Sequence, residues 1–125
     1  MSLSREQIVA AATAPDTKVI DVAEWGGAVR IRAMSYAQRE DFTKQAEALR
    51  DSADPVIGLM QAMLRLVLVS VVNDQNERVF TDTDEELLRS FNFAGYAKVR
   101  DAVQDLNGMR KVFGGPETAD GPLKS

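Results

Sequence analysis

The sequence predicts an α+β fold that is mainly α, with a short N-terminal helix and a β-hairpin packed on a small bundle of three to four helices. Apolar residues alternate with period two only in residues 17–32, whereas five other stretches begin with helix-capping patterns and continue with apolar residues three or four positions apart. The 125 residues suffice for one domain with a modest core. We place this domain at residues 1–108 and expect a flexible C-terminal tail at residues 109–125, because the tail is rich in Gly, Pro and polar residues.

The N-terminal helix is indicated by a capping box at Ser4. Its hydroxyl can accept a hydrogen bond from the backbone N–H of Gln7, whose side chain can return one to the cap. Leu3 and Ile8 stand where a hydrophobic staple would close. Pro15 disfavours helical geometry in the residue before it, so the helix should end near this position.

The hairpin is indicated by alternating residues on either side of the segment Trp25-Gly26-Gly27. The apolar residues expected on one face are Ile20, Val22, Val29 and Ile31. Gly26 and Gly27 can adopt the positive φ angles that tight hairpin turns require, and Trp25 belongs either to the turn or to the strand end. Two strands alone are marginal in water, so the hairpin must pack on a helix or on another copy of itself.

Four further helix starts follow in the sequence. They are Ser35 with Gln38, Asp54 before Pro55, Thr83 with Glu86, and Asn92. The helix after Asn92 should bury Tyr96, Val99, Val103 and Leu106 and end at a C′ glycine, Gly108.

The stretch from Pro55 to Val72 has the densest apolar content. Val56, Met60, Met63, Leu64, Val67 and Val71 share one side, and Leu68, Val69 and Val72 continue its more polar side. Gly58, Gln61, Arg65 and Ser70 interrupt this run, so we predict a buried helix rather than a membrane span. The helix is either central to the fold or covered by a partner, and the central position is favoured.

Composition limits the possible partners and chemistry. A net charge of −4 without a basic stripe argues against nucleic acid as a ligand. Cysteine and histidine are both absent, which removes the usual thiolate nucleophile, general base and transition-metal ligands. The N-terminus lacks the pattern of a signal peptide, so a cytoplasmic location is expected.

No pattern predicts catalytic, cofactor-binding or metal-binding residues. Acid pairs such as Asp82 with Asp84 occur in first helical turns, where carboxylates favour the helix dipole without any catalytic role. The stretch "DTDEE" lacks the glycine and the distant glutamate of a calcium loop, and the glycine pairs lack a phosphate-binding frame. Ser70 should donate a hydrogen bond to a carbonyl one turn earlier.

The candidates for partner binding or self-association are large or flexible apolar residues and the hairpin tip. They are Trp25, Gly26, Gly27, Met60, Met63, Leu68, Val69 and Val72. Trp25 either caps the core or anchors a partner, since tryptophan is enriched in interface hot spots. The two methionines either fill the core or provide an adaptable binding surface.

The order of these segments resembles that of the tail assembly chaperones of long-tailed bacteriophages with non-contractile tails. The similarity covers the chain up to Gly108, and its most specific parts are "EWGG" followed by "VRIR", and "RVFTDTDEE" followed by "LNG". The resemblance implies a non-enzymatic protein that binds the tape measure protein, keeps it soluble, and promotes polymerisation of the tail tube protein around it. It also implies a longer form made by ribosomal frameshifting, a location in the host bacterial cytoplasm and absence from the mature virion. A homo-oligomer is expected for a separate reason, because the hairpin of one copy meeting its neighbour would protect the edges of the two-stranded ribbon.

Other functions remain compatible with the same residues. A head–tail connector or tail completion protein of the virion would share the size, the acidity and the lack of catalytic side chains. An enzyme using Asp82 and Asp84, and a cytoplasmic regulator that sequesters a partner, are further alternatives.

Overall fold

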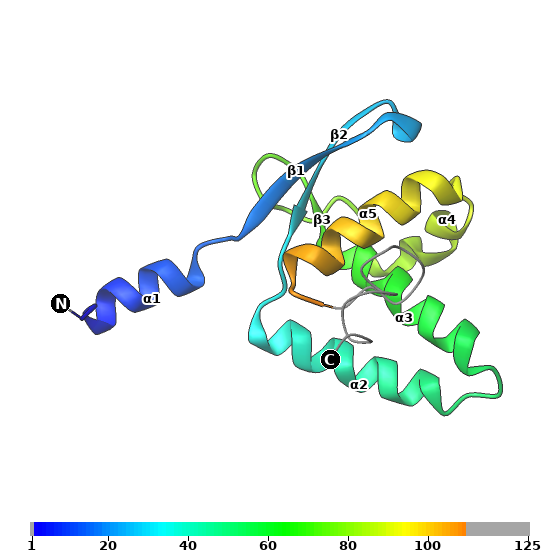
Figure 1. Ribbon diagram of the computed structural model, residues 1–125, viewed down its shortest axis with the longest axis horizontal. Helices are drawn as coiled ribbons and strands as arrows, with labels where there is room; N and C mark the ends of the chain where they lie inside the picture. Colours follow the sequence, from blue (N-terminus) through cyan, green and yellow to red (C-terminus); the bar gives the residue numbers. More distant parts are fainter. Residues whose placement is uncertain (1, 110–125) are drawn as a thin grey trace, which may run out of the picture.

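The computed structural model describes residues 2–109 as five α-helices, a three-stranded antiparallel sheet and two short 3₁₀ segments (Figure 1). The predicted α+β, mainly α class is therefore confirmed. The tail expected at residues 109–125 lies outside the described residues from position 110 onward.

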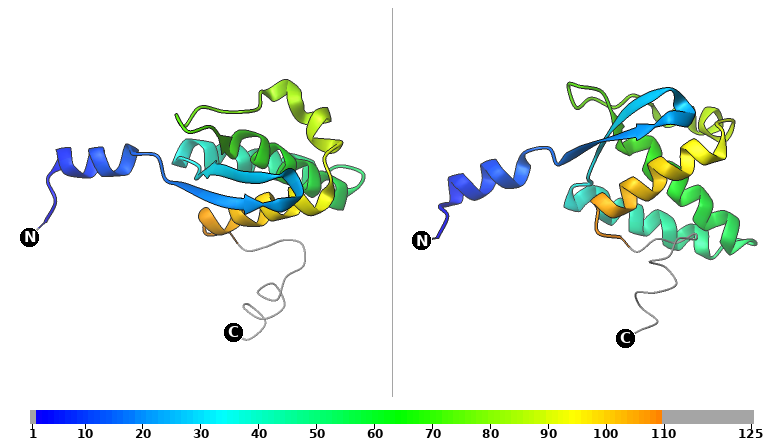
Figure 2. Two further views of the ribbon diagram at one scale, coloured as in Figure 1. Left: turned by 90° about the horizontal axis from the view of Figure 1, so that it is seen from above. Right: turned by 45° about the horizontal axis from the view of Figure 1, so that its top comes forward.

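Helix α1 (Arg5–Thr13) forms as predicted, but it does not pack on the bundle. Both hydrogen bonds of the capping box are present, from Gln7 N to Ser4 Oγ at 3.2 Å and from Ser4 N to Gln7 Oε1 at 2.9 Å. No residue of α1 is buried, and the helix extends away from the rest of the molecule (Figures 1 and 2). The reason is that three of its five apolar residues are alanines, which offer little surface to bury.

The hairpin consists of β1 (Thr17–Val22) and β2 (Gly27–Arg32), which pair from Thr17 with Arg32 to Val22 with Gly27. The face of the hairpin predicted to be apolar is the one that packs on the core, since Val22 and Ile31 are completely buried. The turn is a 3₁₀ segment, η1 (Ala23–Trp25), so Trp25 belongs to the turn. Gly26 has the positive φ of 85°, whereas Gly27 begins the second strand without one, contrary to the expectation for both glycines.

Helices α2 (Tyr36–Arg50) and α3 (Pro55–Ser70) pack against each other. The predicted caps at Ser35 and Asp54 are both present. The two helices approach closely at Gly58, where an added Cβ would overlap the carbonyl oxygen of Leu49. Absence of a side chain at position 58 therefore sets the distance between α2 and α3.

Helix α3 ends two residues earlier than predicted. Val71 and Val72 form strand β3 and pair with Ile31 and Arg30 of β2, so Val72 belongs to the sheet and not to the helix. The hydroxyl of Ser70 donates to the carbonyl of Leu66 at 2.7 Å, as predicted. β-Branched residues favour an extended backbone when a neighbouring strand can pair with them, and β2 supplies that strand.

The chain then continues through η2 (Asp82–Asp84) and α4 (Glu85–Arg89) into α5 (Phe93–Leu106). The capping box before α4 is formed by Thr81 and Asp84, and not by Thr83 and Glu86 as predicted. The cap at Asn92 is present, and Gly108, with φ of 65°, follows the end of α5 as predicted. There the N–H of Met109 bonds to the carbonyl of Gln104 at 2.8 Å, which completes a Schellman motif.

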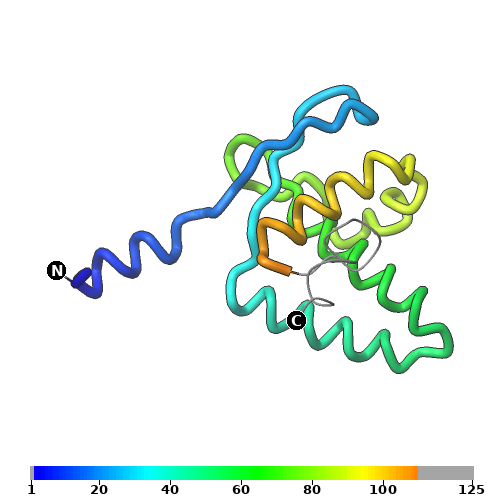
Figure 3. The backbone as a smooth tube through the Cα atoms, viewed as in Figure 1, coloured from blue at the N-terminus to red at the C-terminus, as the bar shows by residue number. Residues whose placement is uncertain are grey.

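Helix α3 is the centre of the core, as predicted. The sheet, α2, α4 and α5 surround it, and α5 contacts both the hairpin and α3 (Figure 3). The largest side chains of the core that are almost completely buried and apolar come from the hairpin, α3 and α5: Val22, Ile31, Met63, Leu66, Val67, Val99 and Val103. The side chain of Asn107 accepts from the N–H of Met34 at 2.7 Å and so ties the end of α5 to the start of α2.

Candidate binding groove

The predicted binding residues do not form one surface. Met63, Leu68 and Val72 are 1%, 3% and 4% exposed, so they belong to the core. Gly26 and Gly27 are exposed at the hairpin tip. Trp25, Met60 and Val69 keep part of their surface exposed, at three separate places.

Trp25 packs against helix α5 of its own chain. Its ring meets that of Phe91 edge-to-face, with centroids 5.3 Å apart and an interplanar angle of 80°. A Cβ added to Gly95 would overlap the indole Nε1, so the indole lies directly on the first turn of α5. The sequence had left Trp25 open between core and interface, and this contact gives it a structural role.

The hairpin tip is also held to α5 by polar contacts. The Glu24 carboxylate is 2.9 Å from Lys98 Nζ, and this hydrogen bond lowers the pKa of Glu24. The side chain of Asn92, besides capping α5, donates to the carbonyl of Glu24 at 3.4 Å. Together with Trp25, these contacts fix the position of the tip.

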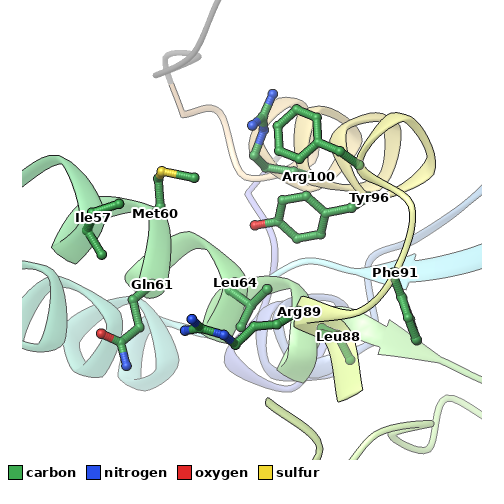
Figure 4. Close-up of a pocket in the computed structure, with 10 residues that line it drawn as sticks. Ile57, Met60, Gln61, Leu64, Leu88, Arg89, Phe91, Tyr96 and Arg100 are labelled. Carbon is green, nitrogen blue, oxygen red and sulfur yellow. The ribbon is translucent and has the colours of Figure 1, made fainter. Parts of the chain in front are cut away.

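An apolar groove of about 260 Å³ lies between α3, α4 and α5 (Figure 4), and we call it the α3/α5 groove. It is lined by Ile57, Met60, Gln61, Leu64, Leu88, Arg89, Phe91, Phe93, Tyr96 and Arg100. Ile57, Met60 and Phe93 are 53%, 40% and 60% exposed, so apolar surface is open to solvent at this place. Aromatic residues, methionine and arginine are the types enriched in protein interfaces.

The charged residues that line the α3/α5 groove are both arginines. Arg100 lies beneath the groove wall, paired with Asp101 at 3.1 Å, with its guanidinium 5.6 Å from the centroid of the Phe93 ring. Arg89 is more exposed and lies 3.5 Å from Glu86. Burial raises the pKa of Tyr96 to about 12, so its hydroxyl, which points from α5 toward α3, stays protonated and can donate a hydrogen bond (Figure 4).

A second cavity, of about 590 Å³, lies on the other side of α3, between α2 and α3. Val69 and Leu68 line it, but so do seven polar or charged side chains: Gln38, Asp41, Gln45, Arg65, Arg78, Asp82 and Glu85. Several of these bond to one another, with Arg65 and Glu85 at 3.0 Å and Arg78 and Asp82 at 2.9 Å. A partner here would have to disrupt existing ion pairs, so the α3/α5 groove is the better candidate for an apolar ligand.

The acid pair considered as a catalytic alternative has structural contacts. Asp82 pairs with Arg78, and the carboxylate of Asp84 accepts from the backbone N–H of Thr81 at 2.8 Å. Among residues 2–109, the His, Cys, Asp and Glu side chains form no group of three that could hold a metal ion. Within the same range, no helix is long and apolar enough to cross a membrane.

Sequence reasoning found only Met60 among the groove residues. It assigned Met60 and Val56 to the buried side of α3, yet Val56 is 60% exposed. The first turns of α3 extend beyond the core, so apolar residues that share a face with core residues are left open there. Ile57 and Met60 lie three positions apart in the first turns of α3 and continue the face of the buried Leu64, and this spacing was the signal available in the sequence.

The fold is a small α+β unit in which a three-stranded sheet and four helices enclose one core, and an apolar groove lies between three of the helices. No family model and no curated protein matches this sequence. The structure is similar to a solved structure described as "Structure of bacteriophage HK97 tail assembly chaperone", with a TM-score of 0.61 and 19% sequence identity. The match covers 81% of this chain and 97% of that one. The chain therefore has the fold of a tail assembly chaperone, as the sequence resemblance predicted.

Proposed function

We propose that this protein is a phage tail assembly chaperone that acts by binding another protein. The observation that carries this proposal is the similarity of fold to the HK97 tail assembly chaperone, over 81% of this chain. The acidic net charge, −4 in 125 residues, suits a protein that must keep an apolar partner in solution. The client we propose is the tape measure protein, a long helical chain that the tail tube protein later surrounds.

The α3/α5 groove is the surface we propose for the client. Its floor is apolar, through Leu64 and Leu88, and its open edges are formed by Ile57, Met60 and Phe93. An amphipathic helix can place an apolar stripe in such a groove, where burial of apolar area provides the affinity. Methionine adapts to different side chains, which suits a client with many similar helical segments.

Co-expression with the tape measure protein tests this function. We expect the wild-type chain to raise the soluble fraction of the client and to co-purify with it. Met60→Lys should reduce co-purification about tenfold or more, because an apolar stripe would have to desolvate an ammonium group beside two arginines. Met60 is 40% exposed, so the variant should fold normally.

Val79→Lys is the matched control, because Val79 is 50% exposed and lines neither cavity. It should leave co-purification unchanged. If the wild-type chain leaves the client insoluble and does not bind it, the proposed function is wrong. If it binds the client and Met60→Lys binds equally well, the function stands and the groove is not the surface.

We also propose that the protein acts in the host cytoplasm and is absent from the finished virion. Particle fractionation distinguishes this role from that of a head–tail connector or tail completion protein. A chaperone should be present in lysates during assembly and absent from purified particles. A longer frameshifted product would appear in the same lysates as a second, larger band with the same N-terminal peptides.

A further inference from the structure

Tyr96 is a buried residue whose hydroxyl lies in the wall of the α3/α5 groove. The residue is 8% exposed, and its ring packs against that of Phe93 with centroids 5.9 Å apart. Figure 4 shows the hydroxyl directed from α5 toward α3. It makes no hydrogen bond with any other residue of the range 2–109. The hydroxyl is therefore placed to bond a group that enters the groove from outside.

Arg89 adds further donors to the same groove. Its side chain extends from α4 toward α3 (Figure 4), and it is 58% exposed. Its Nε lies 3.5 Å from Glu86, and an exposed pair of this kind contributes little to stability. Arg100 is 5% exposed and pairs with Asp101 within the chain. Arg89 is thus the more accessible of the two arginines for an incoming anion.

The walls of the groove favour a helix as the occupant. Ile57, Met60 and Leu64 lie along α3 at positions i, i+3 and i+7, and the wall on α5 extends from Phe93 to Arg100. Each wall is therefore about 10 Å long, or about two helical turns. Helices offer no free backbone edge, so an extended peptide would bury its own N–H and C=O groups without partners. A helix satisfies these groups internally and can place one apolar stripe between the walls.

A helix with a wholly apolar stripe would leave two groove donors without partners. It would displace the water that can bond the hydroxyl of Tyr96 and the guanidinium of Arg89, and burying such groups unpaired costs free energy. The pKa of Tyr96, raised to about 12 by burial, keeps the hydroxyl able to donate at neutral pH. A carboxylate can accept from both groups, and hydrogen bonds between charged groups are stronger than neutral ones. An amide oxygen can also accept, but it leaves the charge of Arg89 unpaired.

We propose that the α3/α5 groove selects client helices whose apolar stripe contains one carboxylate, and that Tyr96 and Arg89 bind this carboxylate. This selection rests on the proposed function of the groove and adds the chemistry of the helices that the groove accepts. Ile57, Met60 and Phe93 provide affinity for the apolar part of the stripe. The two donors decide which helices bind, so Tyr96 and Arg89 determine specificity.

Fluorescence anisotropy with labelled peptides and the full chain tests this selection. The probes are peptides of about 20 residues, long enough to form a helix. Each has leucine at positions i, i+3 and i+7 of one face, and they differ only at position i+4, which is Glu, Gln or Ala. We expect the wild-type chain to bind the Glu peptide about fivefold more tightly than the Gln peptide and about tenfold more tightly than the Ala peptide. The preference for Glu over Gln should decrease with added salt.

Two variants assign this preference to its donors. Tyr96→Phe removes only the hydroxyl, and it should lower the ratio of the Glu and Ala affinities about tenfold. Arg89→Gln should bring the Glu and Gln affinities within about twofold of each other. A residue that only supports the fold would weaken all three peptides alike and leave these ratios unchanged.

The matched controls carry the same substitutions at exposed positions that line neither cavity. Tyr36 is 85% exposed, so Tyr36→Phe corresponds to Tyr96→Phe. Arg50 is 69% exposed and pairs with Glu47 three positions away, as Arg89 does with Glu86, so Arg50→Gln corresponds to Arg89→Gln. Both controls should keep the wild-type ratios. Circular dichroism checks that every variant is folded.

Four results would each overturn the proposal: no binding of any peptide, equal affinities of the wild-type chain for all three, a ratio that Tyr96→Phe or Arg89→Gln leaves unchanged, or a control that changes it equally. The co-expression experiment stays independent of these results. A chain that solubilises the tape measure protein without preferring the Glu peptide keeps the proposed function and loses this selection. A chain that prefers the Glu peptide but leaves the tape measure protein insoluble keeps the chemistry of the groove and loses the proposed client.

Discussion

Glu85 connects α4 to α3 through two hydrogen bonds. Its carboxylate accepts from Gln61 Nε2 and from Arg65 Nε, each at 3.0 Å. Burial alone raises the pKa of Glu85, but these hydrogen bonds and the charges of Arg65 and Arg89 outweigh it and hold the pKa below the ordinary value of 4.5. The folded protein therefore binds the proton at Glu85 more weakly than the unfolded chain does.

This difference predicts a contribution to stability that is lost in acid. A lowered pKa in the folded state stabilises the fold above the unfolded pKa, and the contribution disappears as the pH falls through the folded value. Glu85→Gln should lower the free energy of unfolding at neutral pH by about 1 kcal/mol, since Arg65 is partly solvent-exposed. Urea titrations at several pH values between about 6 and 3 should show a smaller loss of stability for the variant than for wild type.

Glu86→Gln is the control for Glu85. Its side chain is 87% exposed and lies 3.5 Å from Arg89, so removing its charge should change the free energy of unfolding by less than about 0.5 kcal/mol. Equal pH dependence in wild type and Glu85→Gln would show that the hydrogen bonds to α3 do not hold the carboxylate ionised.

The hairpin packs on α5 at Gly95, a residue without a side chain. Gly95 leaves room for the Trp25 indole, and Gly95→Ala should lower the free energy of unfolding by about 1–3 kcal/mol, because its Cβ would displace the ring. Helix propensity alone predicts a gain of up to about 1 kcal/mol, so the sign of the change decides between the two effects. Urea unfolding followed by fluorescence measures it directly, since Trp25 is the only tryptophan.

Gly27→Ala provides a matched comparison within the same hairpin. A Cβ at position 27 would have no atom within 4 Å, and φ there is not positive. Its effect on stability should stay within about 0.5 kcal/mol. A Gly95→Ala variant as stable as wild type, with unchanged emission, would mean that the indole does not rest on α5 as described.

The elements that sequence reasoning predicted well are those fixed by neighbouring residues. The caps at Ser4, Ser35, Asp54 and Asn92 each depend on a side chain and a backbone N–H three positions later, so the sequence contains the whole interaction. The alternation of apolar and polar residues in the hairpin likewise depends only on residues that are close in the sequence. The capping box predicted at Thr83 lies instead at Thr81, before η2, so this error is a choice between two similar local patterns.

The elements that were missed depend on distant partners. Val72 leaves the helix because β2, some forty positions earlier, pairs with it. The contact of Gly95 with Trp25 joins residues seventy positions apart. The α3/α5 groove needs the angle between α3 and α5, which no local pattern contains. For the same reason, the sequence could not show that Met63 and Leu68 lie in the core whereas Met60 lies at the surface.

At the scale of the whole molecule, the residues that hold the fold together differ from those we propose for binding. Trp25 lies where the hairpin meets α5, whereas Ile57 and Met60 lie on the first turns of α3. Phe91 belongs to both places, since its ring meets the Trp25 indole and also lines the α3/α5 groove. The first group packs within the chain and the second is open to solvent. Stability and binding should therefore respond to different substitutions.

The pair Trp25→Ala and Met60→Lys tests this separation. Trp25→Ala should lower the free energy of unfolding by about 2 kcal/mol, because a half-buried ring is lost from the contact with Phe91 and Gly95. The folded fraction should still bind the client, within about threefold of wild type. Met60→Lys should show the reverse, with a melting temperature close to that of wild type and client binding weakened about tenfold or more. Thermal unfolding and client titration of the same two preparations give both quantities. If Trp25→Ala instead lost client binding while keeping its stability, the hairpin tip and not the α3/α5 groove would be the surface that receives the client.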